Sequence, residues 1–396
     1  MVARWRHLLF ACGLFSWCAV STLSLPVSAQ QLPRRSSSVP EIRFGAIEPP
    51  VVAQRDVTVR AAVSNQQPEA MALECSGITW LGTSLLLSSD RHGHVLFTCP
   101  IDLERMEIGM PTPHVVIENE QELLDDAECL TLHRDDNGEL VVYVLCSLSN
   151  DPDELPLPKR RHMLRLLMRD PDRFAVANPR VLNVGTIRDA VNRYFEAVGV
   201  APYRTFNASF VGADKNTYRW GNVEGMCFAP DGRRLLLGLR NPLLAGRAMV
   251  AVVEDIDRIF ARSDPDQLRI TDLFALDLGR RGISDLCWDP LTQGYLITAA
   301  KSNGPRLDKN QAFPPNTLDS ALFWWTGHKQ EAPVLCATFP DMKVEAVCRL
   351  GSTRYIAVGS DEGDVSEGRP QQKQSVVTIL YFTGIEAGNS DGARQR

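Results

Sequence analysis

The apolar positions of the chain fall into short runs, and polar turns separate these runs. Residues 140–145 and 248–253 are rich in Leu, Val and Met or Tyr, which is typical of buried β-strands. Tight turns such as Asp135-Asp-Asn-Gly and Pro230-Asp-Gly lie beside such runs. Because short apolar runs bounded by Gly, Asp and Pro indicate strands and hairpins, the pattern predicts an all-β protein.

The same order of segments recurs five times. Each unit has a leading acid, an apolar run, a turn, a second run, a polar loop and a third run, and the units begin at Glu74, Glu128, Glu224, Asp285 and Glu345. Successive leading acids are 54, 96, 61 and 60 residues apart. The interval of 96 residues has room for two short units or for one unit with an insertion. Repeats of this length with three or four strands predict the blades of a β-propeller.

The repeat therefore predicts a single β-propeller of about six blades, with five to seven as the range. Strand-like segments at 42–45 and 57–60 could supply further strands. An N-terminal strand that pairs with the C-terminal strands would close the ring and remove an exposed edge. One helix is predicted near residues 186–199, because Ile187, Val191, Phe195 and Val198 share one helical face. It would be an insertion within the long interval.

The N-terminus has the features of a signal peptide. Arg4 and Arg6 precede an apolar stretch over residues 8–20, and Val27-Ser-Ala forms a small-residue cleavage site. The apolar stretch is too short to span a bilayer. We therefore expect a periplasmic or secreted protein, with no stable membrane anchor after cleavage.

These features divide the chain into four parts. They are a signal peptide at 1–29, a flexible spacer at 30–41, a propeller domain at 42–385 and a disordered tail at 386–396. We expect the propeller to be a monomer whose partner is a small-molecule or protein ligand.

The charge argues against nucleic acid as that partner. The 396 residues carry 42 Lys and Arg against 48 Asp and Glu, a net charge of −6, without a basic block. A protein that binds the phosphate backbone needs a basic surface. The sequence also lacks the fingerprints of serine hydrolases, zinc peptidases, phosphate-binding loops and dinucleotide folds.

Eight cysteines follow the leader, and none belongs to a Cys-x-x-Cys motif. An exported protein can form disulfides, but eight cysteines permit 105 pairings. Most of the eight lie in apolar runs, where a free thiol behaves as a small buried hydrophobe. Buried thiols and structural disulfides both remain open.

Propeller geometry predicts where the chemistry lies. The innermost strand of a blade begins near the central channel, and the loop between its second and third strands opens on the same face. The leading acids Glu74, Glu128, Glu224, Asp285 and Glu345 are therefore predicted to surround one channel mouth. Candidate binding residues beside them are Asn222, Arg240, Asn241 and Asp361. His92 lies in the same kind of loop, so His92 and Glu224 are the candidates for catalysis. The first turn of each unit is short, which predicts a plain opposite face.

Carboxylates gathered around one axis repel each other. Two unit charges about 6 Å apart cost roughly 3 kcal/mol at an effective dielectric constant near 20. Ca²⁺ would offset this cost with the five leading acids as its ligands. Bidentate pairing with Arg240, Arg280 or Arg281 would offset it without metal. A third interpretation is that the acids do not converge and form ordinary salt bridges at the rim.

Several stretches resemble a known family. Asn222-Val-Glu-Gly-Met, Gly238-Leu-Arg-Asn-Pro-Leu, Gly282-Ile-Ser-Asp-Leu and Glu74-Cys-Ser-Gly-Ile are similar to segments of the exported bacterial family catalogued as domain of unknown function 3616. The resemblance extends over about residues 74–384, and Ser284 stands where that pattern has an arginine. The family has no assigned activity. A remote resemblance to esterase-like phytase and lactonase propellers implies calcium at the channel mouth.

Two functions follow from these observations. One is a calcium-dependent hydrolase of esters or phosphoesters, in which a ring carboxylate is the base. The other is a non-catalytic propeller that binds a ligand or protein on its polar face. The first requires ring carboxylates that converge on one point, whereas the second predicts arginines or apolar groups in the channel.

Overall fold

The computed structural model describes residues 51–60, 70–118, 124–149, 157–197, 222–244, 246–301, 319–340, 342–361 and 375–382. All of them belong to one unit that spans residues 40–396. The predicted signal peptide, spacer and C-terminal tail lie outside the described residues and stay predictions. None of the helices in the described residues is long and apolar enough to cross a membrane.

Five antiparallel sheets make up the described fold. The first contains β3 (Cys75–Trp80), β4 (Ser84–Ser89), β5 (Val95–Asp102), β6 (Glu107–Ile108) and β7 (Thr112–Val115). The second contains β8 (Ala127–Arg134), β9 (Leu140–Cys146), β10 (His162–Asp170) and β11 (Ala175–Asn183). The third contains β12 (Asn222–Phe228), β13 (Arg234–Leu244), β14 (Arg247–Glu254) and β15 (Ile270–Leu276). The fourth contains β16 (Arg281–Asp289), β17 (Gly294–Lys301), β18 (Ser320–Trp325) and β19 (Val334–Phe339). The fifth contains β20 (Val344–Arg349), β21 (Tyr355–Asp361), β22 (Ser375–Tyr381), β1 (Val51–Arg60) and β2 (Ala70–Ala72).

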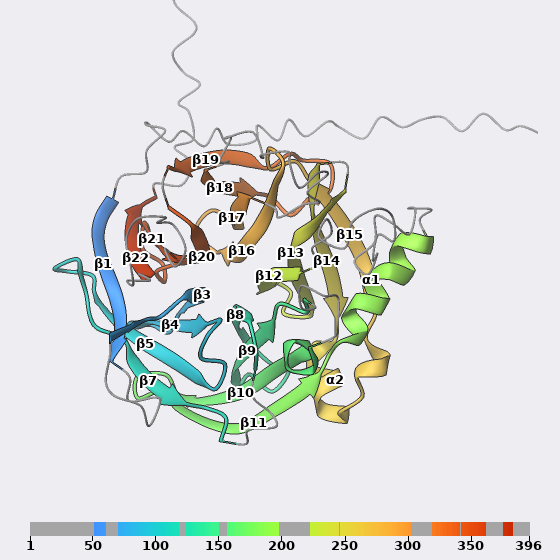
Figure 1. The fold of residues 1–396 in the computed structure, drawn as a ribbon, viewed down its shortest axis with the longest axis horizontal. Coiled ribbons are helices and arrows are strands. Elements are labelled where there is room, and N and C mark those ends of the chain that lie inside the picture. The colour runs from blue at the N-terminus through green and yellow to red at the C-terminus, as the bar shows by residue number, and fades with distance from the viewer. Residues whose placement is uncertain are drawn as a thin grey trace, which may run out of the picture. The chain divides into compact units, whose positions relative to one another are not determined.

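The sheets are the blades of a propeller. The first strands β3, β8, β12, β16 and β20 contact one another in this order, and β20 contacts β3 again. Figure 1 shows these strands around a common centre, with the last strands of the blades at the rim. The described residues thus form five blades, within the predicted range and one fewer than the favoured number.

The difference comes from the long interval in the repeat. Between Glu128 and Glu224 the described residues contain the rest of one blade and then helix α1 (Thr186–Ala197), so the insertion is the correct alternative. The predicted helix is confirmed, and its Ile187 and Val191 are each 1% exposed and belong to the apolar core. Residues 57–60 belong to β1, which pairs with β22 and completes the fifth blade.

The core lies between the blades, because each sheet buries both faces. Five apolar clusters fill the interfaces between neighbouring blades. The contact is close at Gly225 on β12, where an added Cβ would lie 2.8 Å from Leu286 Cδ2 on β16. The eight cysteines from Cys75 onward are free thiols, and seven of them are buried. Buried thiols are therefore the correct interpretation for this structure.

Short helical segments complete the fold. The 3-10 turn η2 (Pro158–Arg161) precedes β10, whereas α2 (Ile256–Arg262) and the 3-10 turn η4 (Pro265–Gln267) lie between β14 and β15. Helix α2 buries Ile256, Ile259 and Phe260, an i, i+3, i+4 face that packs on the third blade.

Candidate functional site

Every innermost strand carries one extra residue near its start. The pairing of β8 with β9 jumps from Ala127 to Cys129, which leaves Glu128 as a β-bulge. The same irregularity occurs in the other four innermost strands. The five bulge residues are Ser76, Glu128, Glu224, Ser284 and Glu345. A bulge redirects one side chain out of the alternation of the strand, so these equivalent positions define a bulge ring around the centre of the propeller.

Three of the five predicted acids belong to the bulge ring, and two do not. Glu74 lies directly before β3, two residues ahead of bulge residue Ser76. Asp285 lies one residue after bulge residue Ser284. Because side chains alternate along a strand, a shift of one residue turns Asp285 away from the channel. Its Oδ2 accepts a hydrogen bond of 2.9 Å from the backbone N–H of Val347, so Asp285 joins the fourth blade to the fifth. Burial raises the pKa of this carboxyl well above its usual range.

Arg240 joins the bulge residues of three blades. Its Nη1 donates to Glu345 Oε2 and to Ser284 Oγ, both at 2.9 Å, and also contacts Glu224 Oε2. Its Nε donates to the backbone oxygen of Lys301 at 2.8 Å. Arg240 is itself an extra residue on β13, because the pairing with β12 jumps from Asn241 to Leu239. The side chain is only 6% exposed, so these contacts are shielded from water.

Neighbouring polar residues hold the two glutamates bound by Arg240. Asn241 Nδ2 donates to Asn222 Oδ1 at 2.9 Å, and Asn222 Nδ2 donates to Glu224 Oε1 at 2.5 Å. On the other side, Lys343 Nζ lies 2.9 Å from Glu345 Oε1 and 3.0 Å from Asp361 Oδ2. The predicted binding residues Asn222, Asn241 and Asp361 therefore position Glu224 and the Lys343–Glu345 pair.

The two glutamates have opposite pKa shifts. Burial raises the pKa of Glu224 to about 7, although Arg240 acts in the other direction. Burial acts in the same direction on Glu345, but the charges of Lys343 and Arg240 prevail and lower the pKa of this carboxyl to about 2. The buried cations thus favour the ionised form of Glu345 more than that of Glu224.

Glu128 is different from the other two ring carboxyls. It is half-buried, and within the described part of the chain it has no hydrogen bond or ion pair. Burial and the charges of Asp126, Glu224 and Asp90 raise its pKa well above the usual range. Nearby, Arg160 pairs with Asp126 at 3.0 Å, and its charge also acts on Glu128 without an ion pair. The first and second blades therefore lack a clamp like Arg240 among the residues described.

The first blade contributes an ion pair between Arg91 and Glu74. Arg91 Nη2 lies 2.5 Å from Glu74 Oε1, and Arg91 Nε donates to Glu74 Oε2 at 3.1 Å. Burial and the adjacent Glu74 raise the pKa of Asp90 to about 8. His92, a catalytic candidate, is 8% exposed, and its Nε2 has no hydrogen-bond partner in the described residues. Burial lowers the pKa of this imidazole.

The ring residues do not fit the expected calcium site. Ca²⁺ needs six to eight oxygen ligands at 2.3–2.6 Å. No group of three His, Cys, Asp or Glu residues with metal-binding geometry occurs in the described segments. Arg240 already binds Glu224 and Glu345, and Asp285 is hydrogen-bonded to backbone N–H groups. Pairing with Arg240 is the alternative that the contacts support, whereas Arg280 and Arg281 form no ion pair with these acids.

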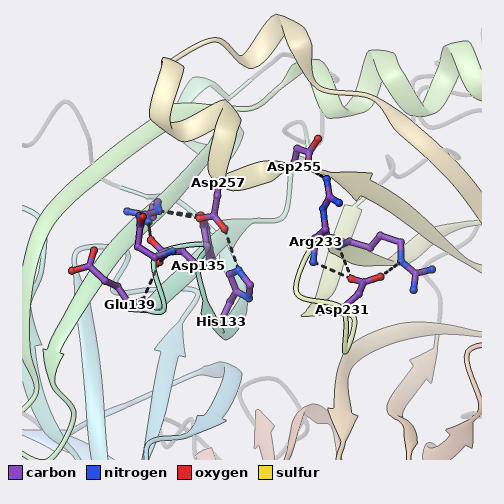
Figure 2. A network of polar contacts seen from close by, with 11 residues as sticks. His133, Asp135, Glu139, Asp231, Arg233, Asp255 and Asp257 are labelled. Atoms are coloured by element: carbon purple, nitrogen blue, oxygen red, sulfur yellow. Dashed lines mark hydrogen bonds and ion pairs between the residues drawn. The ribbon is translucent and has the colours of Figure 1, made fainter.

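The opposite face is not plain. Figure 2 shows Asp257 directed from α2 toward His133, with the β8–β9 turn beside it. His133 Nε2 lies 3.1 Å from Asp257 Oδ2, and Tyr143 donates to Asp257 Oδ1 at 2.5 Å. Arg165 extends the network, with Nη2 at 2.9 Å from Asp135 Oδ2. Although burial acts against it, hydrogen bonds from His133 and Tyr143 lower the pKa of Asp257. The prediction of a plain face was wrong because it considered only the short turn between the first two strands of each blade. In the third blade, α2 lies in the connection between the third and fourth strands.

A different alignment of the sequence would have found the bulge residue of the fourth blade. Glu224-Gly-Met-Cys, Ser284-Asp-Leu-Cys and Glu345-Ala-Val-Cys share a cysteine at the fourth position. Alignment on that cysteine places Ser284 in the column of the two glutamates. Alignment on acids selected Asp285 instead.

Comparisons with known proteins find distant similarities to solved structures. No family matches the chain, and no curated protein matches it, so the resemblance to the family of unknown function stays a prediction. A family 43 β-1,3-galactosidase in complex with galactodeoxynojirimycin has 11% identity and a TM-score of 0.41, over 78% of this chain and 91% of that one. A luciferin-regenerating enzyme has 9% identity and a TM-score of 0.37, over 84% and 98% of the two chains. The propeller domain of Cps50 (Swd1) from Myceliophteria thermophila has 10% identity and a TM-score of 0.32, over 84% and 100%. Likeness at this level carries no argument about fold or activity.

Proposed function

We propose that the protein is an exported, non-catalytic propeller that binds an organic cation at the bulge ring. The observation that carries this proposal is that ion pairs compensate the negative charge of some carboxyls in the bulge ring and not of others. Arg240 binds Glu224, Ser284 and Glu345, whereas Glu128 is half-buried and forms no ion pair or hydrogen bond among the described residues, although the charges of Arg160 and Arg240 act on it from a greater distance.

A ligand with a guanidinium or ammonium group would supply the missing charge. It would face Glu128 as Arg240 faces Glu224 and Glu345. Such a group makes charge-assisted hydrogen bonds with carboxylates without the regular coordination shell that a metal ion requires. The leader-like residues 1–29 support a location outside the cytoplasm.

Calorimetric titration with agmatine, putrescine and CaCl₂ tests the proposal. We expect saturable binding of agmatine and at least a roughly tenfold loss of affinity in Glu128→Gln, which corresponds to about 1.4 kcal/mol. Glu254→Gln is the matched control, because Glu254 is exposed at the end of β14. Absence of amine binding would contradict the proposal. Calcium binding with a chelator-sensitive melting temperature would instead support the metal site.

Hydrolysis is a second candidate, favoured by one specific observation. The pKa of Glu224 is about 7 and that of Glu345 is about 2, and carboxyls with separated pKa values are typical of acid–base catalysis. Glu224 would be the acid in the cleavage of an ester or phosphoester.

Assays with p-nitrophenyl acetate and p-nitrophenyl phosphate between pH 5 and 9, within the range where Glu224 titrates, test this candidate. If it is correct, Glu224→Gln lowers kcat by about 100-fold or more, the usual scale of one acid–base group, and Glu254→Gln leaves it unchanged. Equal rates in both variants would exclude Glu224 as the acid.

A further inference from the structure

A pocket of about 220 Å³ opens on the face opposite the bulge ring. The β8–β9 turn, the β12–β13 turn and the start of α2 surround it. Its floor includes the apolar side chains of Phe228 and Ile256. At about 30 Å³ per water molecule, this volume corresponds to roughly seven waters. The pocket therefore has room for a molecule of amino-acid size.

The floor of the pocket is fixed by the network of Figure 2. The imidazole of His133 stacks on Phe228 with ring centroids 3.9 Å apart and an angle of 13°. Asp257 accepts from Tyr143 and contacts His133, which ties the start of α2 to the second blade. These contacts hold the floor of the pocket in place, so binding would need ordering only of the charged side chains at its rim.

The lining carries both signs of charge. Asp136 and Arg258 are exposed, and their side chains form no hydrogen bond or ion pair within the described segments. Arg233 is only weakly paired, because its Nη2 lies 3.5 Å from Asp255 Oδ1 and its side chain is 72% exposed. Carboxylates and guanidinium groups are thus available around the small exposed part of Phe228, which is 7% exposed, and this arrangement is the complement of a zwitterion.

We propose that this pocket binds a small zwitterion of the α-amino-acid class. Its ammonium group would contact Asp136 and Asp255, and its carboxylate would contact Arg233 and Arg258. Its side chain would lie against Phe228. A ligand with only one of the two charges would leave half of these groups unpaired.

Titration with L-phenylalanine, phenethylamine and 3-phenylpropionate tests this assignment. Phenethylamine lacks the carboxylate and 3-phenylpropionate lacks the ammonium group, while both keep the aromatic body. We expect saturable binding of phenylalanine below about 10 mM and at least roughly tenfold weaker binding of each analogue. No saturable binding of phenylalanine, or equal affinity for either analogue, would overturn the proposal.

Matched variants locate the site. Asp136→Asn and Arg258→Gln should each weaken phenylalanine binding by about tenfold. Arg262→Gln is the control on the same helix, because Arg262 lies outside the pocket and contacts Gln267 Oε1 at 3.4 Å. Equal losses in Arg258→Gln and Arg262→Gln would refute the assignment. Glu128→Gln should leave phenylalanine binding unchanged, so this test is independent of the channel mouth.

Discussion

At the scale of single residues, one inserted position decides which side chains meet at the centre. Without the bulge at Glu224, strict alternation would place its neighbour on the channel side. The same step explains Asp285, which bonds to backbone N–H groups although it is only one residue from Ser284. The hydroxyl of Ser284 lets Arg240 contact the fourth blade, and it adds no further negative charge.

The raised pKa of Glu224 predicts a pH dependence of stability. Glu224 has a folded pKa of about 7, above the value of about 4.3 for an unfolded glutamate. The contribution of Glu224 to the free energy of unfolding is therefore full below about pH 4.3 and is lost as the pH rises through 7. Glu345 behaves in the opposite way, because its folded pKa is about 2. Its contribution is lost only as the pH falls below about 4.3.

Urea unfolding at pH 5, 6, 7 and 8, which brackets the folded pKa of Glu224, measures this effect. We expect the free energy of unfolding of the parent to decrease over this range more steeply than that of Glu224→Gln, with a difference of up to about 1.4 kcal/mol per pH unit. Glu254→Gln should follow the parent. Parallel curves for the parent and Glu224→Gln would show that Glu224 has an ordinary pKa.

Residue-level prediction from the sequence succeeded where an acid happened to stand at the bulge. Glu128, Glu224 and Glu345 were found because the acid pattern and the bulge position coincide there. Ser76 and Ser284 were missed, since a serine gives no charge signal. The contacts of Arg240 depend on a second bulge, on β13, and no periodicity in the sequence specifies such an irregularity.

At the scale of elements, α2 is the feature that sequence analysis did not find. The helix has seven residues, too few to show a clear 3.6-residue period. Its buried face of Ile256, Ile259 and Phe260 resembles a short strand as much as a helix. The longer α1 was found because four apolar residues repeat at helical spacing.

Asp257 should be essential for the docking of α2. In Asp257→Asn an amide NH₂ replaces one oxygen of a carboxylate that contacts His133, Tyr143 and Arg165. The amide has no charge to pair with Arg165, and it can contact His133 only by fixing the tautomer in which Nε2 accepts, so we expect a loss of about 1–3 kcal/mol in the free energy of unfolding. Urea unfolding measures the loss, and hydrogen exchange should show faster exchange in α2 than in the blades.

Asp266→Asn is the control for this variant, because Asp266 is exposed in η4 directly after α2. An unchanged free energy of unfolding in Asp257→Asn would mean that α2 is held by its apolar face alone.

At the scale of the whole molecule, polar contacts between blades add to the apolar interfaces. Arg349 of the fifth blade forms two contacts with Asp289 of the fourth, at 2.9 and 2.5 Å, and their side chains are 2% and 0% exposed. Arg240 joins the third, fourth and fifth blades at the other end of the innermost strands.

The number of blades followed less directly from the sequence, because one interval of 96 residues fits one unit or two.

Closure of the ring depends on β1. It pairs with β22 from Val51 to Val57, and Arg55 also donates to the backbone oxygen of Ile108 on β6 of the first blade. A chain that begins at Leu73 would lack β1 and β2 and would expose the edge of β22, a template for pairing between molecules. We expect this chain to unfold with a free energy lower by on the order of 3 kcal/mol or more, since several ladder hydrogen bonds are lost. We also expect it to associate as its concentration rises.

Light scattering after size-exclusion chromatography, together with urea unfolding, compares this chain with one that begins at Pro50, which keeps β1. The chain from Pro50 should keep the oligomeric state and stability of the full chain, because it retains every pair between β1 and β22. If the chain from Leu73 had the same oligomeric state and stability as well, β1 would not be required for closure of the ring. The ring would then be held closed by the contacts of β3 with β20, β21 and β22.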